Sequence, residues 1–278
     1  MNADARLRSM LRRMRRIVVA YSGGVDSATL LAVAVQECAD DVLAVTGRSP
    51  SVAQDEIEVA CALAQSIGAK HRIIDTREFD NPAYRANSPD RCFHCKDELF
   101  SRLWQIARHE NYGHVADGFN ADDGRSPLDR RPGHAAALRL GVRSPLAEAG
   151  ITKAGVRRIA RRLGLPVWNK PATPCLSSRI PYGTRVELDD LRKIDLGERY
   201  LRARGFAVVR LRHYGGTAVI EVPPDEIVRL GGCLPEVTRA LRSVGYAQVQ
   251  VDPRGYRTGS LNDGLPNGAA SLARMPAT

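Results

Sequence analysis

The stretch RIVVAYSGGVDSATLLAVAV, residues 16–35, contains the change from strand to helix that decides the fold. An apolar run of strand length comes first, and helical spacing of apolar residues begins at Ser27. Between them, Ser22, Gly23 and Gly24 predict a turn in which the backbone can approach a ligand closely. A helix that begins directly after such a turn presents free N–H groups and the positive end of its dipole to an anion. The stretch therefore predicts a phosphate or pyrophosphate site at the carboxyl end of the first strand.

Short apolar runs alternate with helical patterns through the first two thirds of the chain. This order predicts an α/β fold with a parallel, doubly wound sheet and helices on both faces. The expected strands are residues 16–21, 42–47, 71–75 and 114–118, and the expected helices are 27–39, 51–68, 95–110, 133–140 and 152–163. An arginine-rich helix with Leu7, Met10, Leu11 and Met14 on its inner face precedes the first strand. We do not expect a transit peptide, because no spacer separates this helix from that strand.

The pattern changes after the proline-rich segment 166–183. From Glu187 the order becomes a helix, two strands joined by a tight hairpin, two helices and a last strand, which predicts a smaller α+β domain. The expected elements are residues 188–205, 206–214, 217–222, 224–230, 234–245 and 247–251. We therefore expect three parts: a phosphate-binding domain over 1–183, a small substrate or oligomerisation domain over 184–263, and a disordered tail over 264–278.

The chain of 278 residues is basic, with a formal net charge of +10, which is typical of proteins with polyanionic partners. Aromatic residues make up 5% of it, too few for the stacking platforms of a single-stranded nucleic-acid binder. We therefore expect a phosphate-handling enzyme without a membrane partner. Nucleic acid is the less expected partner, although an RNA substrate stays open. Six cysteines without a signal peptide indicate a reducing cytoplasmic setting.

The glycine turn differs from two common phosphate-binding motifs. It lacks the lysine and hydroxyl of a Walker loop, and it lacks the third glycine of a dinucleotide fingerprint. SGGVDS at 22–27 instead resembles the pyrophosphate loop (PP-loop) of the adenine nucleotide α-hydrolase superfamily. The resemblance implies ATP-phosphate contacts from Ser22, Gly23, Gly24 and Ser27. It also implies that Asp26 helps to hold Mg²⁺, which prefers oxygen ligands.

Three polar residues lie at or just beyond the last strand expected in the large sheet. Asp117, Asn120 and Asp122 belong to the stretch DGFNADD, residues 117–123. The carboxyl ends of parallel strands meet at the edge of the sheet where ligands bind. We therefore expect these residues to contact the nucleotide or its metal ion.

Further stretches are typical of one branch of this superfamily. They are RCFHCKDELF (91–100), DGFNADD followed by RPGHAAALRLGVRSPLAEAGITK (131–153), and KPATPCLSSRIPYGT (170–184). Together with GERYLRARGFAVVRLRHYG and GYRTGSLND, they resemble the LarE family over almost the whole chain. The resemblance implies ATP-dependent adenylation of a carboxylate of pyridinium-3,5-biscarboxylic acid mononucleotide, and then replacement of oxygen by sulfur for a nickel-pincer cofactor. It also implies a homo-oligomer.

Cys175 is the expected sulfur nucleophile. It lies between prolines and serines, where a cysteine that only packs is less expected, and the nearby Lys170 and Arg179 would favour its thiolate. In one version of the family this cysteine gives up its own sulfur and ends as dehydroalanine. In related thiolases, a Cys-x-x-Cys pair and one later cysteine hold a [4Fe-4S] cluster that carries exchangeable sulfide. Cys92, Cys95 and Cys175 form such a set, so we slightly favour the cluster version.

Charged residues after Cys175 are candidates for binding the substrate, which carries a phosphate and carboxylates. Arg210 and Arg212 alternate along one expected strand and so share a face. We expect them to bind the anion together with Ser178 and Arg179. Glu198, on the preceding helix, is expected to hold either an arginine or a metal ion.

Two other functions stay open at this point. A tRNA thiolase would share the loop and the cluster, but it would carry an RNA-binding module with interleaved basic and aromatic residues. A non-catalytic nucleotide-binding regulator would not need an intact PP-loop together with a loop cysteine. Pyrophosphate release with ATP and the pyridinium substrate would distinguish the three.

Overall fold

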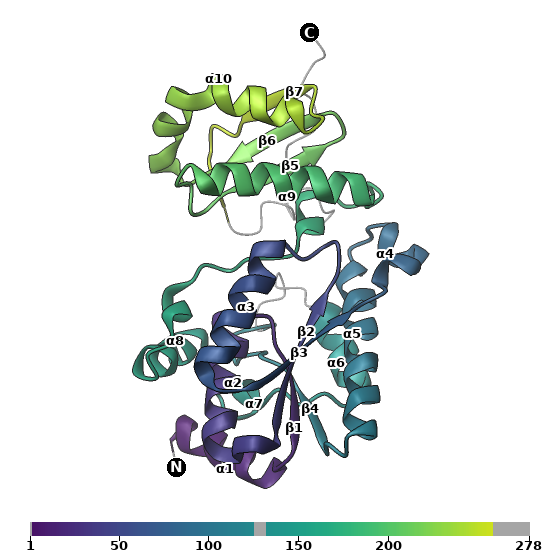
Figure 1. Ribbon diagram of the computed structural model, residues 1–278, viewed down its shortest axis with the longest axis vertical. Coiled ribbons are helices and arrows are strands. Elements are labelled where there is room, and N and C mark those ends of the chain that lie inside the picture. The colour runs from purple at the N-terminus through teal and green to yellow at the C-terminus, as the bar shows by residue number, and fades with distance from the viewer. Residues whose placement is uncertain (1, 125–131, 258–278) are drawn as a thin grey trace. The chain divides into compact units, whose positions relative to one another are not determined.

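The computed structural model describes residues 2–124 and 132–257, which form two compact units (Figure 1). The first unit is Met1–Thr173 and the second is Pro174–Thr278, so the boundary falls inside the proline-rich segment 166–183. The tail over 264–278 lies outside the described residues.

The first unit is built on a parallel sheet with the strand order β3-β2-β1-β4. The central strand β1 (Ile17–Ala20) pairs with β2 (Val42–Arg48) on one side and with β4 (His114–Ala116) on the other. β3 (Lys70–Asp75) pairs with the outer side of β2. The strands expected from the sequence are therefore present, and the predicted parallel α/β fold is confirmed.

Successive residues of β1 face opposite layers of helices, as the alternation of side chains along a strand requires. Ile17 and Val19 belong to one apolar core, whereas Val18 belongs to another. The helices of the first core are α1 (Ala3–Met14), α2 (Val25–Cys38), α3 (Gln54–Ile67) and α8 (Lys153–Arg162). The second core contains α5 (Arg91–His109) and α6 (Pro132–Arg139). Figure 1 shows these two groups on opposite sides of the sheet, which makes it doubly wound.

Shorter helical segments connect these elements. They are η1 (Ala39–Asp41), η2 (Glu78–Asp80), α4 (Pro82–Arg85), α7 (Pro145–Glu148) and η3 (Pro166–Asn169).

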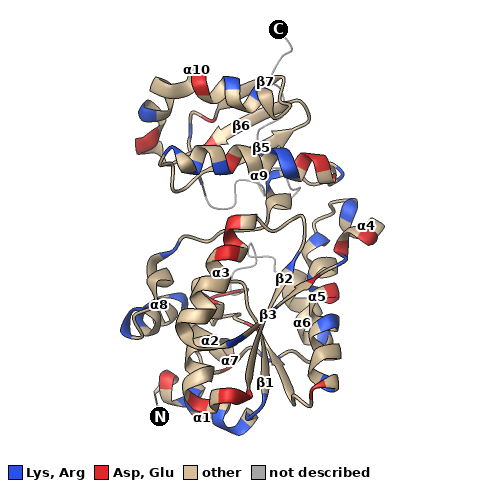
Figure 2. Ribbon diagram, viewed as in Figure 1, with Lys and Arg blue, Asp and Glu red and all other residues tan. Residues whose placement is uncertain are grey.

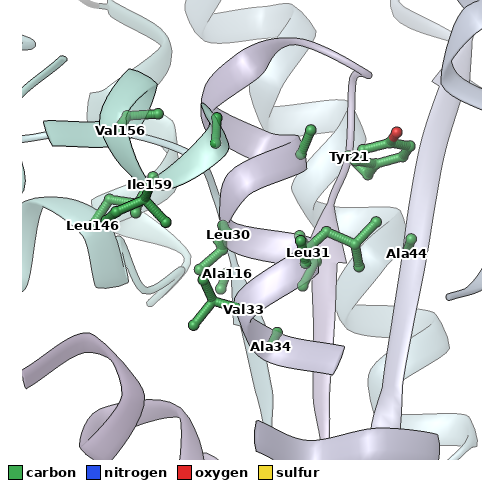
Figure 3. Packing of buried hydrophobic residues seen from close by; sticks show 14 of the residues in the cluster. Tyr21, Leu30, Leu31, Val33, Ala34, Ala44, Ala116, Leu146, Val156 and Ile159 are labelled. Carbon is green, nitrogen blue, oxygen red and sulfur yellow. The ribbon is translucent and has the colours of Figure 1, made fainter. Parts of the chain in front are cut away.

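The helix after the glycine turn, α2, is buried along most of its length. All residues from Ala28 to Ala34 are buried. Figure 3 shows Tyr21 and Ala44 on one side of α2, and Val156 and Ile159 of α8 on the other. A helix that is apolar on all sides belongs in a protein interior. Packing on both sides therefore holds the start of α2 in a fixed position.

The arginine-rich helix α1 buries the inner face expected from the sequence, including Leu7 and Leu11. Arg8 and Arg12 of this helix both form ion pairs with Glu37 of α2. In Figure 2, basic and acidic residues are interspersed over the helices of each unit. No helix within the described ranges has the length and apolar character needed to span a membrane.

The second unit contains a mixed sheet with the strand order β5-β6-β7. β5 (Arg210–Tyr214) is antiparallel to β6 (Thr217–Glu221), and β7 (Gln248–Val251) is parallel to β6. These strands share one apolar core with α9 (Leu188–Ala203) and α10 (Ile227–Ser243). The expected smaller α+β fold is therefore present.

The second unit differs from expectation in two places. Helix α10 follows the turn η5 (Pro224–Glu226) and is continuous from Ile227 to Ser243, across Pro235, whereas the sequence pattern predicts two helices separated at residues 231–233. A proline inside a helix removes one backbone hydrogen bond, but burial of Leu230, Val237 and Leu241 keeps the flanking turns packed on one core. The expected strand over 206–214 begins only at Arg210, and the preceding Phe206 and Val209 are buried in the apolar core without belonging to the sheet.

Candidate active site

The PP-loop lies between β1 and α2, where its hydroxyl groups bond within the loop. The Ser27 hydroxyl accepts from the Ser22 backbone N–H at 3.2 Å and donates to the Gly24 carbonyl at 3.2 Å. The hydroxyls of Ser22 and Ser27 are also 3.2 Å apart. Gly24 is the N-cap of α2 and provides no side chain to cap its first N–H groups. This arrangement suits an anion, since uncapped N–H groups and the helix dipole point the same way.

Gly23 has no room for a side chain. Its φ is +71°, and a Cβ built there would lie 2.9 Å from the Cα of Ala60 in α3. The glycine thus lets the loop pass directly against α3. Gly118, after β4, allows a second close approach, because a Cβ there would lie 2.8 Å from the Ser27 backbone nitrogen.

We expect Gly23→Ala to destabilise the first unit more than Gly141→Ala does. Both glycines have positive φ, +71° and +66°, so both substitutions carry a similar backbone strain. Only the first adds a collision with backbone atoms, since nothing lies within 4 Å of a Cβ at Gly141. Overpacking of this kind costs about 1–3 kcal/mol. Urea denaturation of the two variants measures the difference; equal losses would contradict the predicted crowding at Ala60.

Asp26 is held between an amide and an ammonium group. Its Oδ1 accepts from the Asn120 Nδ2 at 3.2 Å, and its Oδ2 is bonded to the Nζ of Lys153. Asn120 is itself buried, and its Nδ2 also donates to Asp123 at 2.7 Å. The Asp122 carboxylate accepts from the backbone N–H of Lys153 at 2.8 Å. The fold therefore brings the loop after β4 and the start of α8 to the PP-loop.

Asp117 occupies a different position in the same loop. Its Oδ1 accepts from the Ser144 hydroxyl at 2.8 Å and from the Phe119 backbone N–H at 3.1 Å. Burial raises the pKa of Asp117, although these two hydrogen bonds act in the opposite direction. Asp117 is thus hydrogen-bonded to its own loop and to Ser144, and in this structure it shapes the loop that carries Asn120.

Lys153 and Asp123 have no role in the sequence interpretation, although both lie in stretches that resemble the LarE family. Lys153 is the last residue of GITK, and Asp123 closes DGFNADD. No local pattern relates these residues to Asp26, which precedes Lys153 by 127 positions.

The cysteines expected to hold a cluster lie in both units. Cys92 and Cys95 are half-buried in the first turns of α5, three positions apart and thus neighbours on the helix surface. Cys175 belongs to the second unit, and none of the three forms a disulfide. Among the described residues of either unit, no group of three or more His, Cys, Asp or Glu side chains is arranged to hold a metal ion.

Cys175 caps a short turn, η4 (Leu176–Arg179), and its carbonyl is the centre of a hydrogen-bond network. That carbonyl accepts from the Ser178 hydroxyl at 2.7 Å and from the Arg179 guanidinium at 3.0 Å. The same Arg179 nitrogen donates to the Pro174 carbonyl at 2.6 Å. Arg179 therefore fixes the backbone on both sides of the half-buried cysteine. Lys170, expected near this thiol, forms an ion pair with Glu56 of α3 at 2.6 Å.

Glu198 of α9 holds Arg179 in place. The two side chains are each 1% exposed and form two hydrogen bonds, of 2.8 and 3.0 Å. Glu198 also accepts from Arg202 at 3.1 Å and from the backbone N–H of Leu211 at 3.0 Å. Burial acts to raise the pKa of Glu198, but the charge and hydrogen bonds of Arg179 outweigh it and hold that pKa below its ordinary value. Of the two roles expected for Glu198, it takes the first, binding an arginine.

Arg212 and Arg210 are buried on β5. Arg212 forms two hydrogen bonds with Glu221, of 3.0 and 2.9 Å, and donates to the Ser178 carbonyl at 2.8 Å. The Arg210 guanidinium lies 5.1 Å from the centre of the Tyr256 ring, and burial lowers the pKa of Arg210. The sequence interpretation missed Glu221, because its pairing with Arg212 depends on the register of β5 against β6.

Several arginines lie around the Cys175 turn. Arg179, Arg202 and Arg212 pair with Glu198 or Glu221, and Arg210 is buried on the same strand as Arg212. Guanidinium groups of this kind are well suited to binding carboxylates and phosphates.

Comparisons with known proteins relate this chain to several families. Residues 16–88 match the family model of the queuosine biosynthesis protein QueC. An uncharacterized protein of Synechocystis sp. is 43% identical over 258 residues, 92% of this chain and 95% of its own. The tRNA-specific 2-thiouridylase MnmA of Desulforamulus reducens is 27% identical over 195 residues, 56% of this chain and 53% of its own.

One relative with a named activity matches along nearly its full length. The pyridinium-3,5-bisthiocarboxylic acid mononucleotide synthase of Lactiplantibacillus plantarum is 36% identical over 265 residues, 94% of each chain. This match includes both the PP-loop unit and the unit with Cys175, whereas the MnmA match covers about half of the chain. The chain therefore belongs to the LarE family of sulfur-transferring enzymes, within the PP-loop superfamily.

Proposed function

We propose that this protein uses ATP to activate a carboxylate of pyridinium-3,5-biscarboxylic acid mononucleotide and then replaces the carboxylate oxygen with sulfur. The observation that carries the proposal is the full-length match to the synthase, with an intact PP-loop and a cysteine on an arginine-anchored turn. In this proposal, as expected from the sequence, the first unit binds ATP, and the second unit serves substrate binding or oligomerisation. The homo-oligomer and the cytoplasmic location stay predictions.

The first step is assigned to the PP-loop. A substrate carboxylate oxygen attacks the α-phosphorus of ATP, the bond to the bridging oxygen breaks, and pyrophosphate leaves with the electron pair. Ser22, Gly23, Gly24, Ser27 and the start of α2 bind the departing phosphates. Mg²⁺ is usually held by one or two carboxylates together with substrate phosphates, and Asp26 provides such a carboxylate. Asn120, supported by Asp117 and Asp122 in the same loop, orients Asp26.

The second step is assigned to Cys175. Its thiolate attacks the activated carbonyl carbon, AMP leaves, and a thioester forms. If the cysteine is sacrificed, its Cβ–Sγ bond then breaks with loss of the Cα proton, which leaves a thiocarboxylate and dehydroalanine. If the protein instead holds a [4Fe-4S] cluster, Cys92, Cys95 and Cys175 would bind it and the cluster would supply exchangeable sulfide. Cys92 and Cys95 are neighbours on one helix, which supports the cluster version as far as these two of its three ligands are concerned.

Substrate recognition is assigned to the second unit. The mononucleotide carries a phosphate and carboxylates, and the arginines near the Cys175 turn provide guanidinium groups suited to such anions. Arg210 and Ser178 are proposed to contact the anion, while Arg179, Arg212 and Glu198 hold the turn and its hydrogen-bond donors in position.

Asp26→Ala is expected to slow pyrophosphate release about ten- to a hundredfold, since a charge-assisted contact of this kind contributes about 1.5–3 kcal/mol. Asp41→Ala, near the other end of α2 and exposed in an ion pair with Arg16, is the control and keeps the wild-type rate. Pyrophosphate is measured with ATP and the mononucleotide, and circular dichroism verifies the fold. A folded Asp26→Ala variant with an unchanged rate of pyrophosphate release would contradict the assignment of Asp26 to the ATP site.

The same assay separates the proposed function from its alternatives. A thiolated mononucleotide, identified by mass spectrometry, is the expected product of the wild-type protein. Thiolation of tRNA without reaction of the mononucleotide would indicate a tRNA thiolase. ATP binding without turnover of either substrate would indicate a nucleotide-binding regulator.

A further inference from the structure

Lys153 lies on α8, more than a hundred residues after the PP-loop, yet its ammonium group reaches the loop's only charged side chain, Asp26. We propose that Lys153 is a catalytic residue: it binds the β- and γ-phosphates of ATP and offsets the charge that develops on the departing pyrophosphate. This inference rests on the proposed function, because it concerns the adenylation step.

The PP-loop itself contains no cation. SGGVDS has neither lysine nor arginine, and the sequence between Arg16 and Arg48 contains none at all. A Walker loop carries its phosphate-binding lysine within the loop. Here the lysine comes from α8, and the fold brings it to the equivalent place, beside the first turn of the helix that follows the glycines.

The backbone of Lys153 is fixed by the same loop that holds Asp26. Its N–H donates to Asp122 at 2.8 Å, and the carbonyl of Ile151 accepts from the Ala121 N–H at 2.8 Å. Thr152 caps α8 by accepting from the Gly155 N–H at 3.2 Å. The start of α8 is therefore attached to the loop after β4, so the root of the lysine side chain has a defined position.

The lysine side chain itself has room to move. It is 38% exposed and Asp26 is 24% exposed, so their ion pair is partly buried and still reached by solvent. Ion pairs that solvent screens are weaker than fully buried ones. The ammonium group can therefore exchange one acceptor for another at small cost.

ATP supplies the competing acceptor. A divalent cation that accompanies ATP and the Lys153 ammonium would compete for the same oxygen of Asp26, since the other oxygen is already bonded to Asn120. Phosphate oxygens in the loop would then be the strongest acceptors within reach of the released ammonium, a compact charge with three donors. Asp26 thus holds Lys153 next to the loop until the nucleotide arrives.

Binding measurements with ATP and AMP test this role. AMP lacks the β- and γ-phosphates, so Lys153→Met is expected to weaken binding of Mg²⁺-ATP about ten- to a hundredfold and to change AMP affinity less than about twofold. Lys153→Arg should recover part of the ATP affinity. Pyrophosphate formation at saturating ATP should also slow in Lys153→Met.

Lys70→Met is the matched control. Lys70 forms a comparable exposed ion pair, with Asp40 at 3.4 Å, but it begins β3 and so lies at the amino edge of the sheet, away from the PP-loop. This variant should bind both nucleotides as the wild type does. Unchanged ATP binding in Lys153→Met would overturn the proposal. Equal losses for ATP and AMP would also overturn it, because the lysine would then only position the loop.

The two proposals fail in different ways. If wild-type protein binds ATP but releases no pyrophosphate with the mononucleotide, the proposed function is wrong. The difference between ATP and AMP affinities still reports on Lys153 in that case, because it needs no second substrate.

Discussion

Replacing Cys175 by alanine is expected to abolish sulfur transfer while pyrophosphate release continues. Adenylation precedes the sulfur step and is assigned to the other unit. The turn should survive the change, because the bonds that Ser178 and Arg179 make to Cys175 reach its carbonyl and not its thiol. Thiocarboxylate and pyrophosphate are measured in the same reaction. Cys233→Ala, also in the second unit, is the control and should keep both activities.

The two possible sulfur sources differ at Cys92. If three thiolates hold a cluster, Cys92→Ser should lose iron, brown colour and sulfur transfer together, because two remaining thiolates hold a cluster poorly. If Cys175 is sacrificed, Cys92→Ser should still complete one turnover, and the wild-type protein should afterwards weigh about 34 Da less, the mass of hydrogen sulfide. Both versions require Cys175. Sulfur transfer by a folded Cys175→Ala variant would therefore contradict the assigned role in either case.

The architecture of the first unit was predictable because its signals are local. Buried parallel strands are short continuous apolar runs, and the central strands β1 and β2 contain such runs between helical patterns. The edge strands β3 and β4 have only two neighbouring apolar residues each, but the helical patterns on either side of them mark their places. The glycine turn was also readable, because Gly23 must adopt a positive φ directly before α2. These features depend on residues adjacent in the chain.

Most pairings of charged residues were not predictable, because they depend on tertiary structure. The sequence predicts an arginine or a metal ion as the partner of Glu198, but it does not identify Arg179 as that arginine, and it does not pair Arg212 with Glu221. The partner of Asp26, Lys153, follows from the packing of α8 beside α2. Apolar periodicity indicates which face of an element is buried, but it does not indicate which charged residues are buried with that face.

The buried pair of Arg179 and Glu198 leads to the second large effect. Glu198→Ala is expected to lower the free energy of unfolding of the second unit by about 3–5 kcal/mol, because Arg179 would keep its charge in the interior without a partner. Amide hydrogen exchange in β5 measures this effect directly, since the Leu211 N–H donates to Glu198. Glu236→Ala is the control: its ion pair with Arg204, at 3.0 Å, is exposed and should contribute less than about 1 kcal/mol.

Acid should reveal the same interaction. The pKa of Glu198 is lower in the folded chain than its ordinary value of 4.5, so its contribution to stability is complete above that value and decreases as the pH falls below it. Glu198→Gln removes the titrating group and should reduce this loss. An unfolding free energy of Glu198→Ala equal to that of Glu236→Ala would contradict the buried pair.

A double variant separates the stability of the second unit from the placement of its cysteine. Replacing both partners of a buried ion pair by apolar residues often restores stability, because neither buried charge is left without its partner. Arg202, which also contacts Glu198, is partly exposed and so remains solvated. Arg179→Met with Glu198→Met is therefore expected to be more stable than Glu198→Ala. It should still transfer sulfur slowly, because methionine cannot donate to the carbonyls of Pro174 and Cys175. Recovery of both stability and sulfur transfer would mean that Arg179 only balances the charge of Glu198 and does not position the cysteine.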